Sequence, residues 1–429
     1  MQHHRFRHWK PPPNGARDIV CVGDSITYDR AMLRTGIRRN WVEQVATRLD
    51  AIAGAGAPRP GDGFRGLWRD EWKHHGRWTQ ITTSESFDVA PFRQGYLSPG
   101  RKTDRLEWCK PGAMTVTGFD LYWVDAPGTG DWQFRIDGGD WQNIGPPASG
   151  VDESRGTERG KLHRRPVDGP VEVRVEIRAF DGHAPCGAAV VGIAPVRTDP
   201  VASSGTVVHN LGHAHQMLAA FCRDSAGDPL AVLDAIRPQL ITVLFTNDVR
   251  LHDAERFGRE LRGVVDRVDS YADVVLIAPF EQRVPRQVDD AQTTAGSEVV
   301  TSASAVFLAS DSGTQVRGVN IPPGTAIASV QSTEVAMLTS VATGTSAAGE
   351  LAIEGRRQAE IQAAYRSVTR DLAAARGCAF VDLYDAWSTT YGPGWDAAYA
   401  AGLMVDGLHP TQLGHDDIAA RVIAALGTA

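Results

Sequence analysis

The sequence is poor in cysteine, and its few cysteines follow no pattern. The 429 residues hold five of them, none in a Cys-x-x-Cys arrangement: Cys21, Cys109, Cys186, Cys222 and Cys378. An odd and scattered set indicates neither a disulfide framework nor a zinc knuckle. We therefore expect reduced and mostly buried thiols.

Long apolar stretches are missing as well. No run approaches the roughly 20 consecutive apolar residues of a membrane-spanning helix, so we expect no membrane span. The first ten residues are polar and rich in His and Arg, and three prolines follow them. This differs from a signal peptide, which has an apolar centre. We expect a soluble protein made in the cytoplasm.

Lysine is scarce too, because the basic residues are almost all arginine. Lysine occurs at only five positions, and the formal net charge is −7. Such a chain gives no global electrostatic case for binding DNA or RNA. We expect no nucleic-acid partner.

A nucleophile candidate follows the first apolar run. Residues 18–22 are long enough for a buried parallel strand, and they stop at a turn formed by Gly23, Asp24 and Ser25. The carboxyl end of such a strand is where α/β sheets bind their ligands. Ser25 is therefore placed where a reacting group would be useful.

A general base candidate lies near the other end of the chain. Asp406 and His409 are three residues apart, and Pro410 precedes a helical pattern over residues 411–426. The imidazole thus lies on a loop just ahead of a helix. The carboxylate of Asp406 can select one tautomer of His409 and leave the other ring nitrogen free to accept a proton.

Three blocks along the chain carry a family resemblance: Gly23-Asp24-Ser25, Thr246-Asn247-Asp248, and Asp406-x-x-His409. Together and in this order they resemble the blocks of the SGNH (GDSL-type) hydrolases. The resemblance implies a flavodoxin-like α/β fold, a three-layer α/β/α sandwich around a parallel sheet. It also implies a serine esterase in which Ser25 attacks, His409 is the base and Asp406 orients it.

The same resemblance implies an oxyanion hole made by the Ser25 and Gly212 backbone and by the Asn247 side chain. Two positions depart from the family pattern, which has glycine where this chain has His215 and Phe245. Asp24, His215 and Asp248 are candidates for substrate contact, although Asp24 fits a turn-shaping role better than a reactive one.

No cofactor is implied by this resemblance. His213 and His215 alternate as zinc ligands can, but Asp or Cys partners at metal spacing are missing nearby. We therefore expect no metal.

Apolar periodicity predicts the remaining α/β elements. The expected helices span residues 38–49, 216–223, 254–268, 357–376 and 411–426, and the expected strands span 240–245, 274–278 and 379–383.

Two regions break this rhythm with short alternating runs between turn signals, as antiparallel β structure does. Such runs include residues 115–123, 132–136, 171–179, 303–308 and 326–330. We predict two inserted β domains, at 57–204 and 289–354. The hydrolase then comes in three segments: 15–56, 205–288 and 355–429.

Stretches at residues 66–72, 177–182 and 307–314 give most of the chain a second resemblance, to tail-associated proteins of phages that infect actinobacteria. This resemblance implies a minor tail protein in the virion that acts at a bacterial cell surface. Other tail proteins are then possible partners, and a homo-oligomer is possible.

We expect an esterase that removes short acyl groups, above all acetyl, from an envelope polysaccharide or glycolipid. The residues after the catalytic blocks are polar or small, and no lid-like helix is evident, which speaks against a lipase. Two alternatives stay open: an adhesin or structural tail protein with an inactive hydrolase fold, and a lipase acting on envelope lipid esters. Trp68, Trp72 and Trp78 are either a platform for sugar rings or part of a core.

Overall fold

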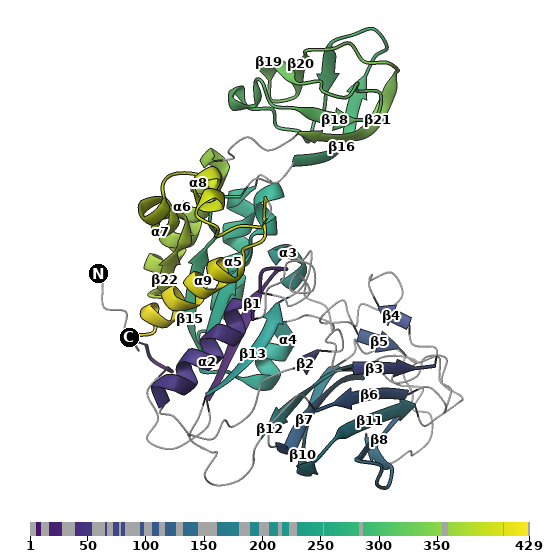
Figure 1. Ribbon diagram of the computed structural model, residues 1–429, viewed down its shortest axis with the longest axis vertical. Coiled ribbons are helices and arrows are strands. Elements are labelled where there is room, and N and C mark those ends of the chain that lie inside the picture. Colours follow the sequence, from purple (N-terminus) through teal and green to yellow (C-terminus); the bar gives the residue numbers. More distant parts are fainter. Residues whose placement is uncertain are drawn as a thin grey trace.

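The computed structural model describes most of the α/β elements and the strands of the β-rich regions (Figure 1). The described residues are 6–9, 17–27, 39–53, 65–66, 72–76, 79–81, 95–97, 105–110, 116–125, 132–144, 161–179, 189–196, 206–212, 217–222, 230–251, 253–282, 286–353, 359–405 and 407–427.

A five-stranded sheet carries the candidate catalytic blocks. Its order is β13-β1-β14-β15-β22, and every pairing is parallel. The strands are β1 (Arg17–Gly23), β13 (Thr206–Gly212), β14 (Leu240–Leu244), β15 (Asp273–Ala278) and β22 (Ala379–Asp382). In chain order this is 2-1-3-4-5, the flavodoxin-like order, which binds ligands where the first and third strands part. The expected parallel α/β fold is confirmed.

Helices cover both faces of this sheet. Side chains alternate along a strand, so Val20 and Val22 enter one core while Ile19 and Cys21 enter the other. The first core includes α3 (Leu218–Phe221), α4 (Leu230–Ile236), α5 (Ala254–Val268) and α6 (Ala359–Arg376). The second includes α2 (Trp41–Ala53), α7 (Leu383–Tyr391), α8 (Trp395–Ala400) and α9 (Gln412–Ala425). The result is three layers.

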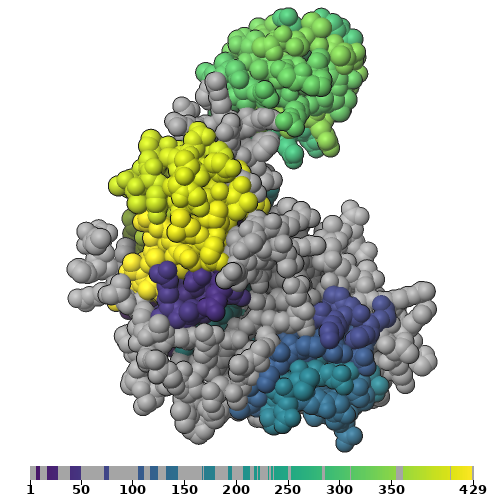
Figure 2. Space-filling view, viewed as in Figure 1, coloured from purple at the N-terminus to yellow at the C-terminus, as the bar shows by residue number. Residues whose placement is uncertain are grey.

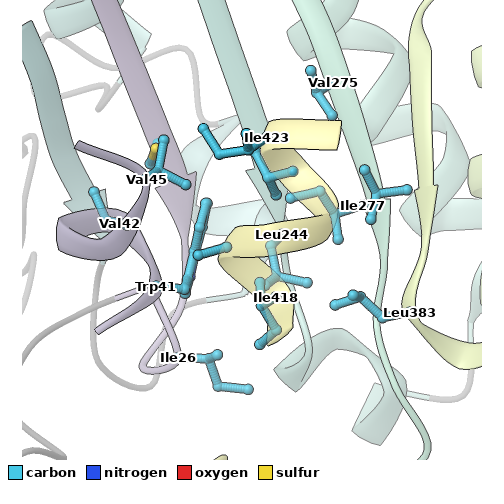
Figure 3. Close-up of a cluster of buried hydrophobic side chains, with 14 of the residues drawn as sticks. Ile26, Trp41, Val42, Val45, Leu244, Val275, Ile277, Leu383, Ile418 and Ile423 are labelled. Atoms are coloured by element: carbon cyan, nitrogen blue, oxygen red, sulfur yellow. The ribbon is translucent and has the colours of Figure 1, made fainter. Parts of the chain in front are cut away.

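The second core joins the two ends of the chain. Figure 3 shows Trp41 and Val45 of α2 beside Ile418 and Ile423 of α9, together with the strand residue Leu244. All five side chains are at least 94% buried. This packing places the start of the chain next to its last helix, and with it the two candidate blocks that are farthest apart in sequence.

Two antiparallel sheets lie between α2 and β13 in the sequence. Sheet B has the order β10-β7-β12-β5-β4, with β2 beside β12, and sheet C has the order β3-β6-β11-β8-β9. Their strands are β2 (Arg65–Gly66), β3 (Trp72–His75), β4 (Thr79–Ile81), β5 (Gly95–Leu97), β6 (Arg105–Cys109), β7 (Val116–Asp125), β8 (Trp132–Ile136), β9 (Gln142–Ile144), β10 (Lys161–Val171), β11 (Arg174–Ala179) and β12 (Ala189–Val196).

These sheets form a sandwich around a common core that contains Trp72, Trp108 and Phe134. Trp72 is therefore a core residue, while Trp68 and Trp78 lie outside the described residues. Sheet B also has a second buried face, because Tyr122 and Ala194 pack into the α/β core that holds α4. The sandwich is thus attached to the α/β unit through apolar contacts.

A fourth sheet lies between β15 and α6 in the sequence. Its order is β18-β21-β16-β17-β20-β19 and it surrounds its own apolar core. The strands are β16 (Arg286–Thr293), β17 (Val299–Thr301), β18 (Val316–Gly318), β19 (Ile327–Ser332), β20 (Val335–Leu338) and β21 (Ser346–Ile353). Figure 2 shows these residues, in green, as a separate lobe at one end of the molecule. The domain boundaries proposed from the sequence stay predictions.

Most expected elements are present within a few residues of their predicted bounds, but two β runs differ. Residues 171–179 were expected as one run, yet Glu172 and Val173 form a bend between β10 and β11, which belong to different sheets. Residues 303–308 form no strand and precede the short 3-10 helix η4 (Ala309–Asp311). Helices α4, α7 and α8 were not predicted. No helix within the described ranges is long and apolar enough to cross a membrane.

Candidate active site

Ser25 lies in a tight turn at the carboxyl end of β1. The turn is closed by the Thr27 N–H, which donates to the Asp24 carbonyl oxygen at 3.1 Å. A Cβ atom at Gly23 would lie 2.3 Å from the Leu244 carbonyl oxygen of β14. Only glycine therefore lets β1 and β14 approach this closely where both strands end.

Asp24 connects this turn to the end of β14. Its Oδ2 accepts from the Thr246 N–H, from the Thr246 hydroxyl at 2.6 Å and from the Asn247 N–H at 2.9 Å, and its Oδ1 accepts from the Ile26 N–H at 3.1 Å. The side chain is fully buried. Burial raises the pKa of Asp24, and these hydrogen bonds oppose the shift. Asp24 thus holds the Ser25 and Asn247 turns together.

Two asparagines hold the other side of the turn. The Asn210 and Asn40 side-chain amides donate to the Thr27 carbonyl oxygen at 2.8 and 3.1 Å. Asn40 also caps helix α2 by accepting from the Glu43 N–H at 3.0 Å. Neither asparagine was predicted as part of the site. The available signal was that Asn210 and His209 are polar residues inside the buried strand β13.

Gly212 is expected from the sequence to help form the oxyanion hole, and this role stays a prediction. Its N–H donates to the Asn210 Oδ1 at 2.8 Å, so this donor is already engaged within the protein. A third oxyanion donor from this turn stays a prediction for residues 213–216. These residues, His213 and His215 among them, lie outside the described part of the chain.

His409 is presented by a short hairpin ahead of α9. Met404 and Pro410 form an antiparallel bridge, and the Val405 N–H donates to the His409 carbonyl oxygen at 2.9 Å. A Cβ atom at Gly414 would lie 2.4 Å from the Leu403 carbonyl oxygen. The start of α9 therefore packs directly on the hairpin and restricts where the imidazole can lie.

The structure brings Ser25 and His409 together. The distance from Ser25 Oγ to His409 Nε2 is 3.4 Å, across 384 residues of sequence. This separation is at the long end of a hydrogen bond, as catalytic pairs often are without substrate. Asp406, the expected third member, lies outside the described residues.

Asn247 and Asp248 follow β14 in the 3-10 helix η3 (Asn247–Leu251). The carboxylate of Asp248 is 1% exposed, and its two oxygens accept from the Leu218 N–H at 3.1 and 3.0 Å. Burial raises the pKa of Asp248 to about 7, and the negative charge of Asp24 adds to this shift. Asp248 therefore holds α3 against the sheet.

Two tentative substrate contacts have structural partners, and their contact with substrate stays a prediction. Asp24 and Asp248 are both buried, and both hold backbone donors instead of facing solvent. The sequence could not distinguish these roles, because a carboxylate beside a catalytic block suits either.

His415 is a buried neighbour of the catalytic histidine that was not predicted. The Trp41 N–H donates to His415 Nδ1 at 3.2 Å, which links α9 to the start of α2. Burial lowers the pKa of His415 to about 3, and a smaller contribution comes from His409. The ring is therefore a neutral hydrogen-bond acceptor. Within the described ranges, no three His, Cys, Asp or Glu side chains gather as a metal site would require.

Comparison with known proteins gives a match at the level of fold. No family model and no curated protein matches the sequence. A solved structure described as "Peptidoglycan O-acetylesterase in action, 5 min" has a TM-score of 0.51 and 14% identity, covering 97% of this chain and 93% of that one. The chain therefore shares the fold of that structure over nearly its whole length.

Two further solved structures are less similar. An acetyl-xylooligosaccharide esterase mutant from Geobacillus Stearmophilus has a TM-score of 0.28 and 14% identity, covering 52% of this chain and 73% of that one. A two-domain esterase active on acetylated mannans has a TM-score of 0.24 and 15% identity, covering 32% of this chain and 36% of that one.

Proposed function

We propose that this chain is a serine esterase that removes short acyl groups, above all acetyl, from carbohydrate of a bacterial cell envelope. The observation that carries the proposal is the 3.4 Å separation between Ser25 Oγ and His409 Nε2. It occurs at the carboxyl end of β1, beside the end of β14, where this strand order binds its ligands.

The reaction begins when Ser25 attacks the ester carbonyl while His409 Nε2 accepts the hydroxyl proton. His409 then returns this proton to the leaving alcohol, and the acyl group stays on Ser25. Water, activated by the same imidazole, releases the acid. Asp406 is proposed to orient His409, on the basis of its spacing in the sequence alone.

The negative charge of the tetrahedral intermediate needs donors beside Ser25. We propose the Ser25 N–H and the side-chain amide of Asn247 for this role, because the Asp24 carboxylate ties the two turns together. One such donor contributes about 3 kcal/mol to transition-state stabilisation. The loss of Asn247 should therefore lower kcat by two to three orders of magnitude.

The acetyl preference rests on two observations. The residues that follow the catalytic blocks are polar or small, whereas a lipase needs an apolar groove or an amphipathic lid. The structure that shares this fold over nearly the whole chain is a peptidoglycan O-acetylesterase. Both favour a small acyl group on an envelope glycan over a long acyl chain.

Covalent labelling tests the nucleophile. A fluorescent organophosphonate should form a stable adduct on the wild-type protein, and tryptic mass spectrometry should place it on Ser25. Ser25→Ala and His409→Ala should each lose both the label and the turnover of p-nitrophenyl acetate. If the wild-type protein were folded but showed neither label nor turnover, the result would favour the alternative of an adhesin with an inactive hydrolase fold.

A series of p-nitrophenyl esters tests the acyl preference. Rates should fall steeply beyond butyrate, and acetate should be released from acetylated peptidoglycan. Faster turnover of decanoate than of acetate would point to a lipase acting on envelope lipid esters.

We also propose that the protein works as part of a phage tail, from the sequence resemblance to tail-associated proteins. Mass spectrometry of purified virions should find its peptides at a copy number similar to other minor tail proteins. Their absence from virions would remove this placement without affecting the esterase.

A further inference from the structure

The outer face of sheet C is polar and charged along its whole width. Strand alternation directs the apolar residues of its strands to the sandwich core and leaves the intervening residues on the opposite face. Cross-strand pairing places Lys73 opposite Glu107, and Glu107 opposite Glu176, which in turn pairs with Arg135. Across these four strands the face is roughly 14 Å wide at ~4.8 Å per strand.

Positive charge dominates this face although the whole chain is acidic. The strands present five permanently cationic side chains, two carboxylates and one imidazole: Lys73, Arg105, Arg135, Arg174 and Arg178, Glu107 and Glu176, and His75. The Asp137 carboxylate, in the turn that follows β8, lies beside these side chains and accepts from the Arg174 N–H. Two positive charges are therefore left over, on a protein whose formal net charge is −7. A local surplus of this kind attracts anions.

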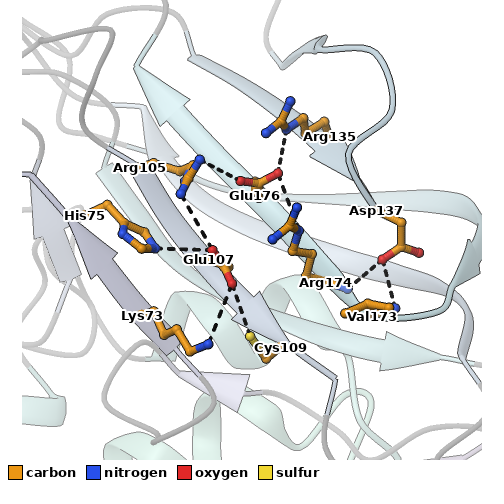
Figure 4. Close-up of polar contacts among 10 residues, drawn as sticks. All are labelled: Lys73, His75, Arg105, Glu107, Cys109, Arg135, Asp137, Val173, Arg174 and Glu176. Carbon is orange, nitrogen blue, oxygen red and sulfur yellow. Dashed lines mark hydrogen bonds and ion pairs between the residues drawn. The ribbon is translucent and has the colours of Figure 1, made fainter.

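The two carboxylates are buried and hold the cations in place (Figure 4). Glu176 pairs with Arg135 at 2.5 Å and with Arg105 at 3.0 Å, and Glu107 contacts His75 at 3.2 Å. The cations are more exposed than the acids, since the Lys73 side chain is 62% exposed and that of Arg174 40%, against 0% for Glu176. The acids therefore lie beneath an exposed cationic layer.

Arg178 has no carboxylate partner in the part of the chain that the structure describes. Its Nε and Nη2 donate to the Gln133 Oε1 at 3.1 and 2.8 Å. Its guanidinium also lies 3.9 Å from the ring centroid of Trp141, and that of Arg135 lies 4.6 Å from the same ring. Burial lowers the pKa of Arg178, and the charge of Arg135 lowers it further. Two guanidinium groups thus lie against the same Trp141 ring, and of the two Arg135 is the one paired with a carboxylate, that of Glu176.

We infer that the outer face of sheet C binds an acidic glycan, whose carboxylate groups pair with Arg178, Arg135 and Arg174. A guanidinium presents a planar pair of donors that matches a carboxylate. Gln133 is buried and links Arg178 to Asn143, because its Oε1 accepts from Arg178 and its Nε2 donates to the Asn143 Oδ1 at 2.8 Å. The exposed amide of Asn143 suits a sugar hydroxyl. The inference rests on the proposed function for its role, which is to hold the polymer whose acyl groups Ser25 removes.

Charge and shape favour a glycan over a nucleic acid. Nucleic-acid sites commonly use many phosphate contacts and aromatic side chains on which bases stack. Here the surplus is two charges, and the chain as a whole is acidic and repels polyphosphate. The only Trp on this face in the described ranges is held against two guanidinium groups. A sparsely charged, hydroxyl-rich polymer complements such a surface.

Affinity electrophoresis with polygalacturonate in the gel tests the inference. The wild-type chain should be retarded relative to a gel with dextran, and 0.5 M salt should abolish the effect. Arg178→Gln should raise the apparent Kd about tenfold. Arg259→Gln is the matched control, because it removes the same charge from an exposed ion pair with Glu255 on helix α5, and it should bind like wild type.

Further variants separate this inference from the proposed function. Ser25→Ala should lose esterase activity and still bind polygalacturonate. Arg178→Gln should keep wild-type turnover of p-nitrophenyl acetate, and Arg174→Gln should weaken binding if Arg178→Gln proves unstable by its Tm. Equal retardation of wild type and both arginine variants would overturn the inference. So would equally strong retardation by single-stranded DNA, which would indicate a general polyanion surface.

Discussion

The α/β unit and the β-sandwich both bury carboxylates, but they surround them with different partners. Asp24 and Asp248 accept from backbone N–H groups and a hydroxyl, and burial raises the pKa of both. Glu107 and Glu176 lie among cations. Burial alone would raise the pKa of Glu107, but hydrogen bonds from Cys109 and His75 and nearby cations lower it.

This difference separates two uses of a buried acid. In the α/β unit the donors to the buried acids are mainly backbone N–H groups. These acids therefore fix the relative positions of the turns and place no charge on the surface. Cationic partners are flexible side chains, so the acid in the sandwich holds an array of charges that faces solvent. We propose that the first arrangement serves a reaction and that the second serves binding.

The largest expected effect comes from Asp24, which positions both Ser25 and Asn247. In Asp24→Asn the amide NH2 must face either the Ile26 N–H or the three donors from Thr246 and Asn247. Unfolding free energy should fall by about 3 kcal/mol. The kcat for p-nitrophenyl acetate should fall at least 100-fold, because the oxyanion donor loses its anchor.

Thr246→Ser is the control for this change. It keeps the hydroxyl that donates to Asp24 and should stay within about threefold of wild-type kcat. An Asp24→Asn enzyme that remains equally active would show that the turns hold their positions without the carboxylate.

The next largest effect is expected for Glu176 in the sandwich. Glu176→Gln removes a fully buried carboxylate and leaves Arg105 and Arg135, which are 34% and 23% exposed, without their full counter-charge. This should lower the unfolding free energy by about 3 kcal/mol. Turnover of p-nitrophenyl acetate per folded molecule should not change, because the site lies on the α/β sheet. Urea unfolding measures the first quantity, with Glu255→Gln as the control.

Glu255 forms an exposed ion pair with Arg259 one helical turn away. Its replacement should cost about 0.5 kcal/mol or less. If Glu176→Gln lowered the unfolding free energy no more than this control, the buried acid would not be holding the cationic layer. The contrast between the roles of Glu176 and Asp24 would then be wrong.

The sequence predicted the α/β elements because their signals are local. Helix α5 was expected at residues 254–268 and spans Ala254–Val268, since its apolar spacing is regular. The candidate nucleophile and base were found by block order, and the structure places them 3.4 Å apart. The supporting residues Asn210 and His415 were missed, because their partners Thr27 and Trp41 are distant in sequence. Asn40 was missed as well, although it caps α2 locally.

The two misread β runs also depend on distant partners. Residues 171–179 alternate as one strand would, but the Asp137 carboxylate accepts the N–H groups of residues 172–174 and bends the chain there. Likewise Asp290 accepts from the Ser304 N–H at 2.9 Å, and Val306 has a positive φ of 45°. A turn that is held by a side chain from a distant part of the chain leaves no signal in its own local sequence pattern.

The third prediction concerns acid stability and His415. In the folded protein its pKa is lowered to about 3, whereas in the unfolded chain it should titrate near ~6.5. The stabilisation that comes from keeping His415 neutral is therefore fully present above pH 6.5, and it is lost as pH falls toward 3. Between pH 7.5 and pH 5 this group alone should remove about 2 kcal/mol of unfolding free energy.

His415→Asn isolates that contribution, because its side-chain oxygen can still accept from the Trp41 N–H. Between pH 7.5 and pH 5, the unfolding free energy of the variant should decrease by about 2 kcal/mol less than that of wild type. Denaturant unfolding at the two pH values measures it. Parallel stability curves for wild type and variant would mean that His415 is protonated within the fold.

The smallest effect is expected for Lys73, which lies in the same network as Glu176 but is exposed to solvent. Its Nζ is 3.9 Å from Glu107 Oε1, and its side chain is 62% exposed. Lys73→Met should change the unfolding free energy by about 0.5 kcal/mol or less.

Salt distinguishes Lys73 from Glu176, because raising ionic strength from 0.1 to 1 M shortens the screening length from about 10 to 3 Å. The effect of Lys73→Met should vanish in 1 M NaCl while most of the Glu176→Gln effect remains, since buried charges are screened less. If both effects vanished together, burial would not distinguish the acids from the cationic layer above them.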